Sequence, residues 1–154
     1  MRKLVMLVGL IGLISLNANA EILRIGGSKD TSDPEAVYMN VVNGEASSVA
    51  KGSLMKPSAT ADDGVTALKT TDATDVPICV MAVTCSAGAV CRCQTYGFAD
   101  FILADGQDNA ISAGQKMTAS AYDARVDGGT GHVVGVALDA NSASGSLEGF
   151  IMLR

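Results

Sequence analysis

VPICVMAVT (Val76–Thr84) and CRCQTYGFADFIL (Cys91–Leu103) are the two stretches of sequence that decide the fold. Both are rich in β-branched, aromatic and small apolar residues, which is typical of strands. The first predicts a buried strand. The second predicts one long strand, or two strands joined at Gly97, where the irregular pattern indicates a bend or bulge. Together they predict an antiparallel hairpin that turns about Gly88.

Shorter strands are expected on both sides of this hairpin. Asn43-Gly44 is a strong hairpin-turn signal, so Val37–Val42 is expected to fold back onto Ser47–Lys51. The other expected strands are Leu54–Met55 (ended by Pro57), Val65–Leu68, the end of Ile111–Met117, His132–Leu138 and Leu147–Leu153. Roughly eight short strands at near-regular spacing predict an all-β fold, a small β-barrel or β-sandwich of short antiparallel strands with an N-terminal extension.

The first twenty residues have the composition of a secretory signal. Arg2 and Lys3 precede the apolar run Leu4–Leu16, and Ala18-Asn19-Ala20 supplies the small residues that a signal peptidase requires. The competing interpretation is an apolar arm that stays attached and packs on a neighbouring subunit. We therefore divide the chain into residues 1–20 (signal-like segment or arm), 21–35 (extended arm) and 36–154 (β domain).

Composition narrows the class of partner. The net charge is −5, and Lys and Arg are not clustered, which argues against binding to nucleic acid. Apolar residues make up 48% of the chain but aromatic residues only 4%, so the core must consist of small aliphatic side chains. The expected partners are protein subunits, and the only membrane contact expected is transient, through the signal peptide.

The sequence shows no recognisable catalytic, cofactor or metal motif. The single histidine, His132, is interpreted as a strand residue at a sheet edge, and no G-x-S-x-G nucleophile motif is present. Gly128–Gly131 lacks the spacing of a dinucleotide-binding loop, and Asp105, Asp108 and Asn109 do not fit a calcium-loop pattern. We expect no catalytic residues, no metal and no cofactor.

The four cysteines lie within the predicted hairpin. A hairpin that turns about Gly88 places Cys85 opposite Cys91, within reach of a disulfide. A second bridge between Cys79 and Cys93 requires a local irregularity. If the chain is secreted, disulfides are favoured, whereas in a reducing compartment the four thiols are small buried side chains.

The order of short motifs from Val42 to Arg154 resembles that of phage capsid decoration (cement) proteins. The resembling pieces are AKGSLM (Ala50–Met55), VPICVM (Val76–Met81), Phe98–Leu103, ISAGQKM (Ile111–Met117), HVVGVAL (His132–Leu138) and the closing strand from Leu147. The resemblance implies a small β-barrel on the outer surface of a virion, where it clamps major capsid subunits or copies of itself. A secretory signal and clustered cysteines depart from this family.

Three functions remain open at this stage. The first is a non-catalytic virion protein that stabilises the head shell as part of a homo-oligomer or lattice. Its contacts are expected in loops 58–64 and 105–109 and in an arm formed by Glu21, Ile22, Leu23, Arg24 and Ile25. The second is a secreted bacterial surface or filament subunit with disulfides. The third is a small secreted binding domain or hydrolase.

Overall fold

The computed structural model describes residues 36–61, 63–105, 109–121, 124–141 and 144–153. The described residues form strands and loops without a helix, which confirms the all-β prediction. The nine strands are β1 (Val37–Asn43), β2 (Leu54–Pro57), β3 (Thr66–Lys69), β4 (Cys79–Met81), β5 (Val90–Ala104), β6 (Lys116–Ala119), β7 (Val126–Asp127), β8 (Val133–Ala137) and β9 (Gly145–Met152).

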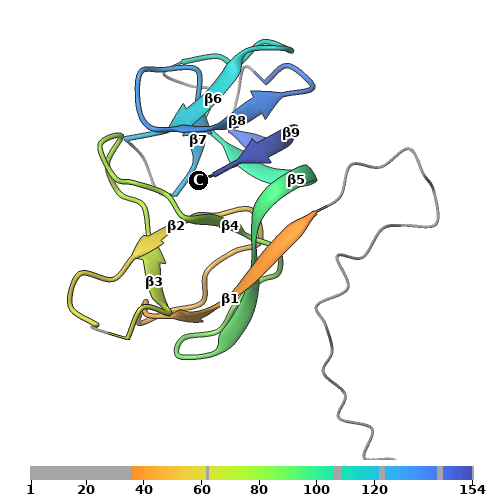
Figure 1. Ribbon diagram of the computed structural model, residues 1–154. Coiled ribbons are helices and arrows are strands. Elements are labelled where there is room, and N and C mark those ends of the chain that lie inside the picture. The colour runs from red at the N-terminus through yellow and green to blue at the C-terminus, as the bar shows by residue number, and fades with distance from the viewer. Residues whose placement is uncertain (1–35, 62, 106–108, 122–123, 142–143, 154) are drawn as a thin grey trace, which may run out of the picture.

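The strands close into two rings that share β5 (Figure 1). In the first ring the pairing runs β1–β3–β2–β4–β5 and returns to β1; in the second it runs β5–β7–β6–β8–β9 and returns to β5. Most pairs are antiparallel as expected, while β1 with β3 and β5 with β7 are parallel. Closure leaves few strand edges without a partner.

β5 can serve both rings because it carries a bulge. Ala99 pairs with Gly149 and Ile102 with Leu147, so Asp100 and Phe101 together oppose the single residue between those partners on β9. The extra residue reverses the inward-facing positions along the strand, from Cys93, Gly97 and Ala99 before the bulge to Ile102 and Ala104 after it. Gly97, where the bend was expected, has a positive φ of 101° and lies between two register irregularities of β5, one at Thr95 opposite β1 and the other at this bulge.

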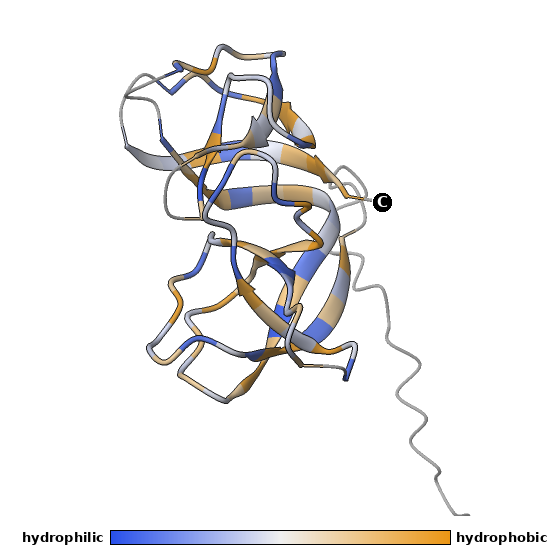
Figure 2. Ribbon diagram, turned by 90° about the vertical axis from the view of Figure 1, so that its left-hand side faces the viewer, coloured by the Kyte–Doolittle hydropathy of each residue, from blue (hydrophilic) through white to orange (hydrophobic). Residues whose placement is uncertain are grey.

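A central layer of β2, β4 and the start of β5 separates two hydrophobic cores. Leu54 and Val80 are register partners that face the core of the second ring, whereas Met55, Cys79 and Met81 face the core of the first. Both faces of this layer are therefore buried, which explains the continuously apolar sequence around β4. Hydrophobic and hydrophilic positions are interleaved along the strands of both rings (Figure 2).

The hairpin expected at Asn43-Gly44 is wrong. β1 instead pairs with β5 and, in parallel, with β3, so the return strand expected at Ser47–Lys51 does not form. The Asn43 side chain holds the chain as a loop here: its amide donates to the carbonyls of Ser47 and Cys85, and its oxygen accepts the Glu45 amide. Local turn propensity was overridden by the distant β5 strand.

Candidate assembly surface

The structure joins Cys85 to Cys91 and Cys79 to Cys93. The first bridge connects the residues that the hairpin was expected to place opposite each other. The second follows from a different register in β4: Met81 pairs with Cys93, so Cys79 lies diagonally across from Cys93 with a Cα–Cα distance of 5.5 Å. Both bridges lie in the core of the first ring, and Cys79, Cys85 and Cys93 are fully buried. Their position indicates a structural role.

The expected arm contacts Glu21, Ile22, Leu23, Arg24 and Ile25 lie outside the described residues, as does Asp108. The described chain begins at Ala36, directly before β1. The surface that surrounds the start of β1 is consequently the part of the domain nearest in sequence to the arm.

Among the residues that the structure describes, β1 has a strand partner on one side only over most of its length. Its whole length from Val37 to Val42 pairs with β5, but on the other side β3 joins it only at Val42 and Asn43. The Val42 amide donates a hydrogen bond to the Val65 carbonyl on the β3 side. Because the backbone N–H and C=O groups of successive residues point to alternate sides of a strand, those of Tyr38 and Asn40 point to this same side. We call residues 38–41 the open edge of β1.

An apolar groove adjoins this open edge. It has a volume of about 380 Å³ and is lined mainly by apolar side chains from five parts of the fold: Met39, Pro57, Ser58, Ala61, Gly64, Thr66, Ile78, Thr95 and Leu153. Met39 lies on the inward face of β1, as does Val41, so the groove opens into the first ring where its strands separate. Loop 58–64, one of the expected contact loops, forms part of its wall.

A carboxylate fixes the loop that forms this wall. The Asp63 carboxylate accepts hydrogen bonds from the amides of Val65 and Thr66 and from the Thr66 hydroxyl. The Thr66 hydroxyl and these backbone amides lower the pKa of Asp63. These hydrogen bonds fix the positions of Gly64 and Thr66 in the wall of the groove.

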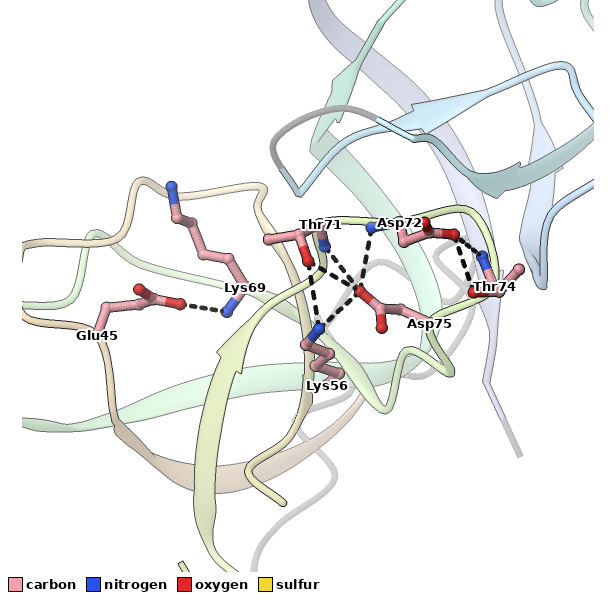
Figure 3. Close-up of polar contacts among 7 residues, drawn as sticks. All are labelled: Glu45, Lys56, Lys69, Thr71, Asp72, Thr74 and Asp75. Carbon is pink, nitrogen blue, oxygen red and sulfur yellow. Dashed lines mark hydrogen bonds and ion pairs between the residues drawn. The ribbon is translucent and has the colours of Figure 1, made fainter. Parts of the chain in front are cut away.

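Figure 3 shows a second polar cluster, next to β2 and β3. The Asp75 carboxylate accepts a hydrogen bond from the Lys56 ammonium at 2.8 Å and from the amides of Thr71 and Asp72 at 2.7 and 3.1 Å. Burial raises the pKa of Asp75, but the Lys56 hydrogen bond and the Thr71 amide outweigh that effect and hold it below its ordinary value. The cluster holds the loop after β3 against β2, so the charges of Lys56 and Asp75 stabilise the fold.

The other residues that could take part in catalysis or metal binding are dispersed over the fold. His132 is exposed, and its backbone amide donates to Ala73. Asp127 accepts the Thr118 hydroxyl and the Gly129 amide. Within the ranges that the structure describes, His, Cys, Asp and Glu form no group of three or more that could hold a metal ion.

A second apolar area lies on the outer face of β5 and β9. Tyr96 and Met152 are register partners and are 46% and 40% exposed, and the Tyr96 ring contacts the Phe150 ring edge to face at 5.0 Å. Sequence reasoning missed both this patch and the groove. The patch had a signal: Tyr96 and Phe98 alternate with the inward-facing Cys93 and Gly97.

In sequence, the chain matches no model of a known protein family and no curated protein. In structure, it is similar to the head fiber gp8.5 N base of bacteriophage phi29, with a TM-score of 0.56 and 16% identity. The match covers 77% of this chain and 96% of that one, so the shared fold extends through most of the described domain. No helix in the described ranges is long and apolar enough to cross a membrane.

Proposed function

We propose that this chain is a non-catalytic structural protein of a phage virion that packs on other subunits at the head surface and stabilises the head shell as a decoration protein. The observation that carries the proposal is the fold that it shares with the base of a phage head fiber. The motif order that resembles capsid decoration proteins supports the same class of protein independently.

The chemistry of the described residues supports a structural role. Asp63, Asp75 and Asp127 each accept several hydrogen bonds from neighbouring backbone and side-chain groups, and Lys56 is paired with Asp75. A catalytic site instead needs ionisable groups that converge on a space where substrate binds. The groove, the cavity beside the open edge of β1, is lined mainly by apolar side chains, which suit contact with protein.

The proposed partners are the major capsid protein or further copies of this chain, and the proposed location is the capsid surface. The proposed contacts are Glu21–Ile25 of the arm, loops 58–64 and 105–109, and the patch around Tyr96. A protein that binds only the assembled shell stabilises it by mass action, and many copies add their effects without any single strong contact.

The direct test is to purify virions that encode this chain, identify their proteins by mass spectrometry and locate the chain by electron cryomicroscopy. We expect many copies on the outside of the head. Virions that lack the chain should release DNA at a lower temperature, and adding back the purified chain should restore the wild-type temperature. Virions that contain none of the chain would overturn the proposal.

A second candidate function is a secreted bacterial surface or filament subunit. The two buried disulfides favour it, because such bridges persist in oxidising compartments. Intact mass of the native protein separates the two functions. A chain that starts at Glu21 and carries both bridges supports the secreted subunit, whereas an intact N-terminus supports the virion protein.

A further inference from the structure

We infer that the apolar groove beside the open edge of β1 receives the segment Glu21–Ile25 from a second copy of this chain. The segment would add as a strand to β1 and insert alternate side chains into the groove. This inference deepens the proposed function, on which it rests for the presence of neighbouring copies, by naming the contact between them.

The first argument is the backbone chemistry of the open edge. The peptide groups of Tyr38 and Asn40 point to the side of β1 where β3 joins only at Val42 and Asn43. A row of such groups is a template for another extended chain. An added strand would continue the line of β3 and complete the first ring along the whole of β1.

The second argument is the match of side chains. A strand paired with β1 turns alternate residues toward the same face as Met39, which lines the groove together with Ile78, Pro57 and Leu153. In Glu21–Ile25, Leu23 and Ile25 are two residues apart and share one face, whereas Ile22 and Arg24 share the other. The aliphatic pair would enter the groove, and Arg24 would remain in solvent.

The size and the lining of the groove are those of a binding pocket. About 380 Å³ lies in the range of roughly 300–1,000 Å³ that is typical of pockets for small ligands. The lining is mainly apolar, and the hydroxyls of Ser58, Thr66 and Thr95 are its polar exceptions. A short aliphatic segment fits this lining better than a charged or sugar-like ligand.

The length of the connection favours a second copy over the same chain. Residues 26–36 (GGSKDTSDPEA) join the segment to β1. A hairpin within one chain would need all eleven of these residues as its loop, whereas hairpin loops usually contain about 2–5 residues. Extended at about 3.3–3.6 Å per residue, they can span almost 40 Å and reach a neighbour. Reciprocal exchange between two copies would fill two grooves with one symmetric contact.

The experiment uses the purified chain with residues 21–35 retained, as an equal mixture of ¹⁴N- and ¹⁵N-labelled copies. A photo-crosslinking residue replaces Leu23, and a matched sample carries it at Ile22. We expect mixed-isotope crosslinks from position 23 to peptides that contain Pro57 or Ile78, at least fivefold more abundant than from position 22. Crosslinks only within one copy, or to peptides away from the groove, would overturn the inference.

Substitutions supply a second readout. In sedimentation velocity, the double variant Leu23→Asp and Ile25→Asp should weaken self-association at least tenfold, while Ile22→Asp should change it less than twofold. Ala61→Asp, which places a charge in the groove wall, should match the double variant, and Ala46→Asp at an exposed loop position should match the wild type. Equal dissociation constants for Ala61→Asp and Ala46→Asp would contradict the groove as the binding site.

The inference and the proposed function fail separately. If the chain is absent from virions but gives the expected crosslinks, only the proposed virion role is contradicted. If the chain is abundant on heads but gives no crosslink between copies from position 23, in solution or on the heads, only the inferred exchange of Glu21–Ile25 between copies is contradicted.

Discussion

Cys79 on β4 and Cys93 on β5 are diagonal neighbours, because the register pairs Met81 rather than Cys79 with Cys93. Their bridge therefore fastens the central layer that divides the two cores. The Cys85–Cys91 bridge closes only the turn beside it, with a sequence separation of 6 against 14. The two disulfides have the same chemistry but different structural effects.

Removing each disulfide separately should lower the free energy of unfolding by a different amount. In the loop-entropy description, the Cys79–Cys93 bridge stabilises the fold by about 3 kcal/mol and the shorter Cys85–Cys91 loop by about 2 kcal/mol. We expect Cys79→Ala with Cys93→Ala to lower the free energy of unfolding more than Cys85→Ala with Cys91→Ala. Urea denaturation of both double variants checks this order, and a larger loss for the shorter loop would contradict it.

Gly52 should resist substitution because of both its conformation and its surroundings. Its φ is +89°, and a Cβ there would lie 2.0 Å from the Phe101 carbonyl oxygen. Its amide donates to Met81 and its carbonyl accepts Leu103, so it connects β4 with the second half of β5. We expect Gly52→Ala to destabilise the fold by more than about 3 kcal/mol.

Gly88 is the matched control for this prediction. Its φ is also positive, at +69°, but nothing lies within 4 Å of the position of a Cβ. Gly88→Ala should therefore cost only the backbone strain, about 1–2 kcal/mol. Thermal or urea unfolding of the two variants isolates the contribution of the close contact, and equal losses would show that the contact relaxes freely.

The Gln94 side chain satisfies two backbone carbonyls of its own strand, β5. Its amide donates to the carbonyls of Tyr96 at 3.1 Å and Phe98 at 2.8 Å, and its side chain is fully buried in the central layer. Gln94→Leu keeps the approximate volume but leaves both carbonyls without this donor, so we expect a loss of about 2–3 kcal/mol in unfolding free energy. The comparison is Arg92→Leu on the exposed face of β5, which should cost under about 1 kcal/mol.

The Lys56–Asp75 pair should make stability depend on pH in acid. The folded pKa of Asp75 is below its ordinary value of 3.8, so as pH falls the unfolded chain binds the proton first. The contribution of the pair is therefore complete above pH 3.8 and is lost as pH falls through the lower, folded pKa. Because both side chains retain some exposure, we expect a contribution of about 1 kcal/mol or less.

The variant Asp75→Asn checks this prediction. Its unfolding free energy should lie below that of the wild type at pH 7, and the difference should shrink as pH falls below 3.8. Asp100→Asn at an exposed position of β5 serves as the control. A difference that stays constant between pH 7 and pH 2 would show that Asp75 acts through packing and not through its charge.

Local sequence patterns predicted a good part of the fold and little of the candidate assembly surface. The strands at Val37–Val42, Val65–Leu68 and His132–Leu138 are present within a residue or two, because alternation and turn residues act over a few positions. The strand expected over Val76–Thr84 is present only at Cys79–Met81, since its flanking residues leave the sheet. The groove was not predictable, because its lining comes from strands and loops distant in sequence.

The sequence by itself predicted an all-β fold and a hairpin that places Cys85 opposite Cys91, since both depend on neighbours along the chain. Only the tertiary structure decided that the strands close into two rings about β5, that Cys79 meets Cys93, and that β1 keeps an open edge beside a groove. These features depend on register. Register between distant strands is decided by which faces the cores bury and by the extra residue of the bulge at Asp100 and Phe101.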